Sequence, residues 1–137
     1  MIGIRHIALF VKELEKAVDF YQNTIGMRIE WQPDMDNIYL TNDGDVLALH
    51  RIDDYPDGLQ RLDHIGFVLK NIDDVDHWYN YLIGQNVRVT EAPKTHRDGA
   101  RGFYCLDPVG NFLEFIYHPP ISHAAILPAL IVKKVKD

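Results

Sequence analysis

A histidine, a tyrosine and a glutamate are spaced along residues 96–115, HRDGARGFYCLDPVGNFLEF. Imidazole nitrogens and carboxylate oxygens are ligands for divalent cations, and a tyrosine hydroxyl can donate a hydrogen bond to a bound anion. The segment Asp107-Pro108-Val109-Gly110 has the composition of a turn and divides the stretch into two strands. One hairpin therefore carries three groups with metal-binding or acid–base chemistry, His96, Tyr104 and Glu114.

The composition limits what this hairpin can belong to. A chain of 137 residues with 47% hydrophobic and 25% charged residues is long enough for one well-filled core. Its formal net charge of -6 and its scattered Lys and Arg residues argue against nucleic acid as a partner. The single Cys105 cannot form an internal disulfide, which favours a reducing, cytoplasmic location. No apolar run is long enough to suggest a transmembrane helix, so no membrane partner is expected.

The chain contains an internal repeat. Residues 5–26, RHIALFVKELEKAVDFYQNTIG, superimpose without a gap on residues 63–84, DHIGFVLKNIDDVDHWYNYLIG, at an offset of 58. Each copy opens with a short strand and continues as an amphipathic helix that a glycine, Gly26 or Gly84, is expected to end. Three strand-like segments then follow in each copy.

This order predicts an α+β fold of two paired βαβββ modules, in residues 1–53 and 61–118, followed by a C-terminal extension in residues 119–137. The second module has eight extra residues around APKTHRDG, residues 92–99, where we expect a long loop. Both sheets carry apolar residues on the face away from their helices. We therefore expect the modules to form a cupped mixed sheet with the helices outside.

Strand alternation predicts which side chains point into the cup. If Ile7 and its alternating partners pack on the helix, then His6 and, by the repeat, His64 point the other way. The same argument turns Glu114 away from the helices. Two imidazoles and a carboxylate in a mostly apolar cup need compensation, which a divalent cation would supply. The facial arrangement is that of non-haem Fe(II) oxygenases, with Mn(II), Zn(II) and Ni(II) as alternatives.

These residues resemble the vicinal oxygen chelate superfamily, which includes glyoxalase I, fosfomycin thiol transferases, bleomycin-binding proteins and type I extradiol ring-cleaving dioxygenases. The resemblance covers residues 4–118. The spacing from His96 through Phe103-Tyr104 and Asp107-Pro108-x-Gly110 to Glu114 is similar to the extradiol dioxygenase signature.

The resemblance implies a role for each position that matches. It implies metal ligation by His6, His64 and Glu114. It further implies that His50 is the acid–base residue, and that His96 and Tyr104 hydrogen-bond the metal-bound substrate oxygen. Asp98 would correspond to an acidic neighbour of the signature histidine. The implied activity is Fe(II)-dependent oxidative cleavage of a catechol-like aromatic, which would make the protein an oxidoreductase.

The chain also departs from the family patterns. Such dioxygenases commonly have two paired-repeat domains, whereas this chain has one. Lys94 stands where the signature has a shorter or uncharged residue, which leaves a thiol transferase open as an alternative. Against that alternative, Ala8 lacks the hydroxyl that such transferases have just after the first metal ligand. Ala48 cannot supply the fourth metal ligand of glyoxalase I. Three functions remain: a dioxygenase, a metal-dependent transferase or lyase, and a bleomycin-resistance-type module that binds a small molecule. The C-terminal extension is apolar and then basic and has no counterpart in the repeat, so we expect a homodimer.

Overall fold

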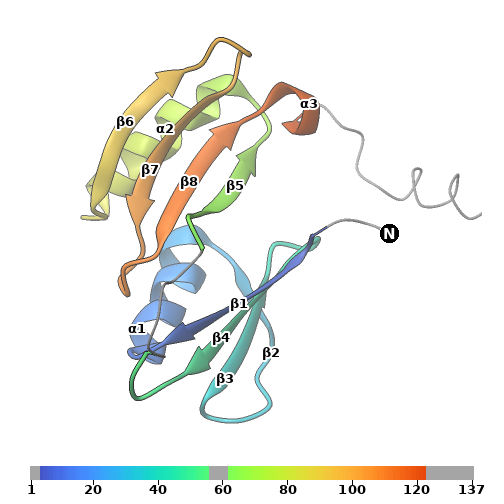
Figure 1. Ribbon diagram of the computed structural model, residues 1–137, viewed down its shortest axis with the longest axis vertical. Helices are drawn as coiled ribbons and strands as arrows, with labels where there is room; N and C mark the ends of the chain where they lie inside the picture. Colours follow the sequence, from blue (N-terminus) through green and yellow to red (C-terminus); the bar gives the residue numbers. More distant parts are fainter. Residues whose placement is uncertain (1–3, 56–61, 123–137) are drawn as a thin grey trace, which may run out of the picture. The chain divides into compact units, whose positions relative to one another are not determined.

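The computed structural model of the protein describes residues 4–55 and 62–122, which fall into two compact units. The N-terminal unit contains Ile4–Asp63 together with the turn Leu106–Asn111. Of the described residues, the C-terminal unit contains His64–Cys105 and Phe112–Ser122. Each unit has its own four-stranded sheet, drawn in Figure 1.

The sheet of the N-terminal unit has the strand order β1-β4-β3-β2, with β1 parallel to β4 and the other pairs antiparallel. Its elements are β1 (His6–Val11), α1 (Leu14–Asp19), the π-helical turn η1 (Phe20–Ile25), β2 (Arg28–Trp31), β3 (Asn37–Thr41) and β4 (Val46–Arg51).

The C-terminal unit repeats this arrangement in the order β5-β8-β7-β6, with β5 parallel to β8. Its elements are β5 (Ile65–Leu69), α2 (Ile72–Gly84), β6 (Val89–Thr95), β7 (Arg101–Leu106), β8 (Phe112–Tyr117) and the short α3 (Pro119–Ser122). The α+β class and the two βαβββ modules are therefore confirmed. The closure of the two sheets into a cup stays a prediction.

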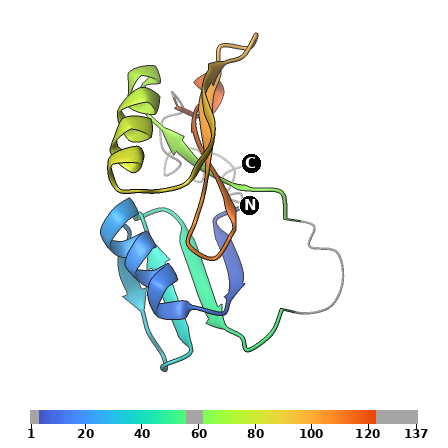
Figure 2. The ribbon, with the colours of Figure 1, turned by 90° about the vertical axis from the view of Figure 1, so that its left-hand side faces the viewer.

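Strand alternation places the apolar side chains on the helix side of each sheet, as the sequence predicts. On β1, Leu9 and Val11 are buried whereas His6 is exposed on the opposite face. On β8, Phe115 is buried and its ring stacks on that of Phe103, with centroids 5.3 Å apart. Figure 2 shows that α1 and α2 each cover one face of their own sheet. The other face of each sheet carries polar side chains together with exposed aromatic ones such as Phe10 and Phe112.

The two helices end differently. Gly26 follows η1 with a φ of 93°, the left-handed conformation expected of a C-terminal glycine. Gly84 ends α2 as its last residue, as predicted, but the left-handed residue that follows this helix is Asn86, with a φ of 60°. Asparagine is the non-glycine residue that adopts this conformation most readily, so it replaces glycine at the turn.

The expected long loop at residues 92–99 is also shorter than predicted, because β6 continues to Thr95. Only residues 96–100 connect β6 to β7. The pairing of β6 with β7 shifts register between Val89 and Glu91 and again between Glu91 and Lys94. The extra residues of the second module therefore lengthen a bulged hairpin.

The Asp107-Pro108-Val109-Gly110 turn is anchored through a buried carboxylate. Asp107 is 4% exposed and accepts hydrogen bonds from the backbone N–H groups of Val109 and Asn111, at 3.0 and 2.8 Å. It also accepts one from the hydroxyl of Tyr21, at 2.6 Å, and Tyr21 is fully buried beside α1. The aspartate of the motif thus attaches the β7–β8 turn to the N-terminal unit.

No helix within residues 4–55 and 62–122 has the length and apolar character needed to cross a bilayer. The apolar and basic stretch after residue 122, for which packing against a second subunit is predicted, lies outside the described residues.

We expect Asp107→Ala to lower the free energy of unfolding by about 2–4 kcal/mol. The substitution removes the carboxylate that accepts hydrogen bonds from two backbone N–H groups of the turn, and it leaves the buried hydroxyl of Tyr21 without this acceptor. Tyr21→Phe should cost less, since the carboxylate keeps its backbone donors. Urea denaturation of the full chain measures both. Equal stability of Asp107→Ala and the wild type would contradict the anchoring role.

Candidate metal centre

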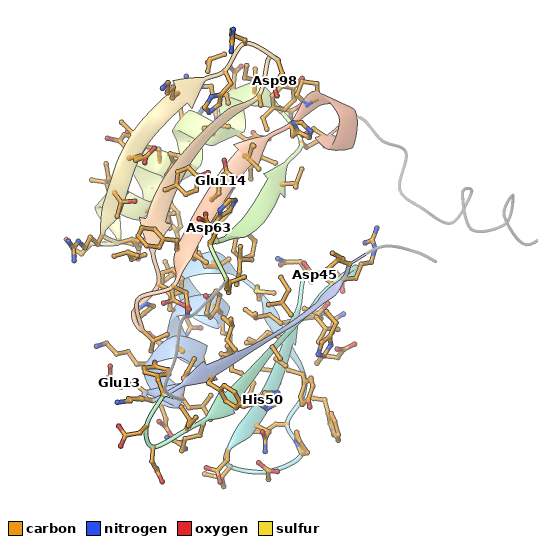
Figure 3. The ribbon with its side chains drawn as sticks, in the orientation of Figure 1. Glu13, Asp45, His50, Asp63, Asp98 and Glu114 are labelled. Carbon is orange, nitrogen blue, oxygen red and sulfur yellow. The ribbon has the colours of Figure 1, made fainter. Side chains whose placement is uncertain are left out.

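His64 and Glu114 face each other across the sheet of the C-terminal unit. His64 immediately precedes β5, and Glu114 lies in the middle of β8, where it pairs with Gly66 (Figure 3). The Nε2 atom of His64 is 3.1 Å from Oε2 of Glu114. The structure therefore brings together two of the three predicted metal ligands.

The burial of Glu114 makes this contact important. The residue is only 8% exposed, although it carries a carboxylate. Such a group needs a positive partner, either a protonated imidazole or a cation. Two neighbouring ligands at 2.0–2.2 Å from one ion and at right angles have donor atoms about 3 Å apart. The observed separation therefore suits a shared divalent cation as well as a direct ion pair.

Tyr104 contacts the same imidazole from β7. Its ring is perpendicular to that of His64, with centroids 5.2 Å apart. The side chain is half-buried on the face away from α2. The imidazole of His64 thus contacts both the Glu114 carboxylate and the Tyr104 ring, and Tyr104 adds a phenolic hydroxyl to this cluster.

Two glycines flank Glu114, and one of them, Gly102, lies close to its carboxylate. Gly66 is its direct partner on β5, and a Cβ there would meet nothing within 4 Å. Gly102 lies on the other side, on β7. A Cβ at Gly102 would stand 3.0 Å from the carbonyl oxygen of Phe115 and 3.2 Å from Oε1 of Glu114. A side chain at Gly102 would therefore crowd both the backbone of β8 and the carboxylate of Glu114, one of which would have to shift by a few tenths of an ångström.

His6 belongs to the N-terminal unit, on β1. Its side chain is exposed on the face opposite α1, and its ring centroid is 6.4 Å from that of Tyr39. Within each unit, the described residues contain no group of three His, Cys, Asp or Glu side chains that could hold a metal ion. A three-ligand centre that includes His6 stays a prediction.

His50 lies on the same face as His6 but at the far end of β4. His6 pairs with Val46, and His50 follows four residues later, about 13 Å along the strand. Tyr39 pairs with Ala48 and lies between the two imidazoles, with its centroid 5.9 Å from that of His50.

A hydrogen-bonded chain that the sequence did not suggest supports His50. Its Nδ1 is 2.6 Å from Oδ1 of Asn37, and Nδ2 of Asn37 donates to both carboxylate oxygens of Asp34, at 2.8 and 2.9 Å. The spacing of Asp34 and Asn37 is compatible with a side-chain turn. Their contact with His50 follows only from the pairing of β3 with β4, in which Asn37 is opposite His50.

His96 is exposed in the β6–β7 turn. Its backbone N–H donates to Ala100 at 2.7 Å, and the backbone N–H of Ala100 also donates to the carboxylate of Asp98 at 3.0 Å. Figure 3 shows Asp98 at the tip of this hairpin. Ala100 precedes Tyr104 by four residues, so the turn lies about 13 Å along β7 from Tyr104. The predicted cooperation of His96 with Tyr104 stays untested.

Comparison with known proteins agrees with this architecture. Residues 3–115 match the family model described as "Glyoxalase: Glyoxalase/Bleomycin resistance protein/Dioxygenase superfamily". The chain belongs to this superfamily. Its membership agrees with the predicted vicinal oxygen chelate family, whereas a closer relation to extradiol dioxygenases stays a prediction.

Several solved structures share the fold. A lactoylglutathione lyase from Agrobacterium tumefaciens is 19% identical with a TM-score of 0.73, covering 87% of this chain and 96% of its own. A possible glyoxalase from Bacillus cereus is 25% identical with a TM-score of 0.68, covering 84% and 98%. TioX from Micromonospora sp. ML1 is 16% identical with a TM-score of 0.71, covering 85% and 98%. These likenesses show that the fold is shared.

The two glycines of this superfamily member provide a matched test of the site. Gly102→Ala should displace the Glu114 carboxylate and weaken divalent-metal binding by about 10-fold or more, as changes to groups that orient ligands do. Gly66→Ala should leave metal binding unchanged, because its Cβ would meet open space. Isothermal titration with Mn(II) or Zn(II) compares them. Equal affinities in both variants and the wild type would contradict the role of Gly102 in placing the Glu114 carboxylate.

Proposed function

We propose that the protein is a metal-dependent enzyme that cleaves a catechol-like aromatic by the extradiol route, with Fe(II) as its metal. The observation that carries the proposal is the pair formed by the His64 imidazole and the buried Glu114 carboxylate, 3.1 Å apart, with the Tyr104 ring against the imidazole. The donor set suits the cation, because one carboxylate and neutral imidazoles leave a divalent ion with a net positive charge.

His64 and Glu114, with His6 from the N-terminal unit, would hold the metal. Bound there, Fe(II) would accept both oxygens of a catecholate and allow electron transfer to dioxygen. The protein residues position these partners. Glu114 keeps the imidazole of His64 oriented, and the flanking Gly102 leaves room beside the carboxylate.

Tyr104 would stabilise the ionised substrate. A phenolic hydroxyl donates a hydrogen bond without bringing a charge of its own, so it suits an oxyanion next to the metal. We assign His96 as a second donor, delivered by the β6–β7 turn. The exposed side chain of His96 leaves it accessible to a ligand on that side of the hairpin.

His50 would act as the acid–base residue. Imidazole can take and return a proton near neutral pH. His50 on β4 and Tyr39 on β3 lie on the same face of the sheet, with ring centroids 5.9 Å apart. His50 would therefore contact the part of a substrate that packs on the Tyr39 ring. We further propose a homodimer with no nucleic-acid or membrane partner. We also propose a cytoplasmic location, which suits a single cysteine, Cys105, that is free and buried.

A second candidate function is a module that binds a small aromatic molecule. The observation in its favour is the aromatic surface of the N-terminal unit. Trp31 and Phe10 are 58% and 54% exposed, and the rings of Trp31 and Tyr39 lie 5.1 Å apart. A lyase of the glyoxalase I type is a weaker candidate, because Ala48 stands in place of a fourth ligand.

Removal of either proposed ligand from the C-terminal unit should abolish tight metal binding. We expect His64→Ala and Glu114→Gln to weaken Fe(II) binding by more than about 100-fold, which exceeds the effect of losing a supporting group. The matched controls are His77→Ala on α2 and Glu91→Gln on β6, both exposed. Anaerobic equilibrium dialysis measures the bound iron. Wild-type affinity in both ligand variants would refute the metal centre.

Oxygen consumption tests the reaction. The iron-loaded protein should consume oxygen with at least one member of a panel of catechols, and Tyr104→Phe should lower kcat by about 100-fold because it removes a donor to the oxyanion. Metal binding without oxygen uptake from any catechol would contradict the dioxygenase and favour a transferase or lyase. Tight binding of an aromatic without metal would favour the binding module.

A further inference from the structure

The hydrogen bonds around Asn37 determine which nitrogen of His50 carries the proton. A carboxylate only accepts hydrogen bonds, so the amide nitrogen of Asn37 must face Asp34. The amide oxygen of Asn37 then faces His50. An oxygen cannot donate, and the 2.6 Å contact therefore requires a proton on Nδ1 of His50. In the neutral imidazole, Nε2 is left as the basic nitrogen.

Asp34 is well suited to define this polarity. Its pKa is lowered first by the backbone N–H of Asp36 and next by the Asn37 side chain, so it remains an acceptor at neutral pH. The backbone N–H of Asp36 donates to Asp34 Oδ1 at 2.8 Å. Two neighbouring residues thus hold the carboxylate in the direction of Asn37.

The opposite face of β4 braces the same loop. Arg51, the residue after His50, donates from Nε to the Asp36 carboxylate at 2.9 Å and from its backbone N–H to the Asp36 carbonyl at 2.8 Å. Its guanidinium also pairs with Glu15 on α1. The loop that carries Asp34 is therefore attached to β4 and to α1, which limits rotation of the Asn37 amide.

We propose that Asn37 and Asp34 are positioning residues that hold the neutral imidazole of His50 in its Nδ1–H tautomer, with Nε2 presented as the base. The catalytic consequence rests on the proposed function, in which His50 moves a proton. The tautomer itself does not. An unconstrained histidine in water favours the Nε2–H tautomer, so an Nδ1–H tautomer at His50 would distinguish it from a free side chain.

Nitrogen-15 NMR of the full chain tests the proposal, at a pH where His50 is neutral. The signals of His50 are identified by their loss in His50→Gln. We expect Nδ1 to give the protonated-type shift and Nε2 the unprotonated-type shift in the wild type. Asn37→Ala and Asp34→Ala should move the balance toward Nε2–H. The matched control is Asn23→Ala, since Asn23 also donates to an aspartate, Asp19, at 2.7 Å, with no histidine in that hydrogen bond.

A double exchange separates positioning from a general structural effect. Asp34→Asn with Asn37→Asp keeps the net charge and reverses the donor, so residue 37 can still accept from Nδ1 of His50. We expect it to restore the Nδ1–H tautomer that each alanine variant loses. An Nε2–H tautomer in the wild type, or an Nδ1–H tautomer retained in Asn37→Ala, would overturn the proposal. The wild-type spectrum decides even if a variant fails to fold.

Turnover distinguishes this proposal from the proposed reaction. If the protein consumes oxygen with a catechol, Asn37→Ala should lower kcat by about 10-fold or more with little change in KM, as loss of an orienting partner does. Unchanged kcat would show that the tautomer is not used. If the wild type and the variants show the expected tautomers but neither the wild type nor any variant turns over a catechol, the positioning role stands and the proposed dioxygenase activity is contradicted.

Discussion

A carboxylate buried in the middle of a sheet must be neutralised, and this requirement organises the C-terminal unit. Glu114 is 8% exposed on the face of β8 that points away from α2. The imidazole of His64 lies 3.1 Å from it, and Gly102 leaves the carboxylate its space. In a superfamily whose scaffold hosts several chemistries, the local arrangement of such groups is what argues for one function.

The N-terminal unit handles its polar groups differently. Its exposed face is aromatic, and the one imidazole at the far end of β4, His50, is oriented by an amide that is itself oriented by Asp34. Fixed hydrogen-bond polarity of this kind prepares a base before any ligand arrives. The C-terminal unit thus pairs a buried carboxylate with an imidazole, whereas the N-terminal unit holds an imidazole through a chain of hydrogen bonds.

The sequence predicts those features that repeat or alternate. The offset of 58 residues locates both modules, and strand parity correctly puts His64 and Glu114 on one face. Features that depend on long-range packing are not visible in the same way. The buried hydrogen bond from the Tyr21 hydroxyl to the Asp107 carboxylate joins residues 86 positions apart. The local sequence around either residue does not indicate this pairing. Gly84 ends α2 as predicted, but the left-handed conformation after this helix belongs to Asn86, which the glycine pattern does not indicate.

The central claim is that one divalent cation is bound by two imidazoles, those of His6 and His64, and by Glu114. The most direct measurement is proton NMR of the Co(II)-substituted full chain, in which the ring N–H proton of each coordinated histidine is shifted far outside the ordinary range. The account predicts two such exchangeable signals, one lost in His6→Ala and the other in His64→Ala. No shifted imidazole signal, or two signals that survive both substitutions, would contradict it.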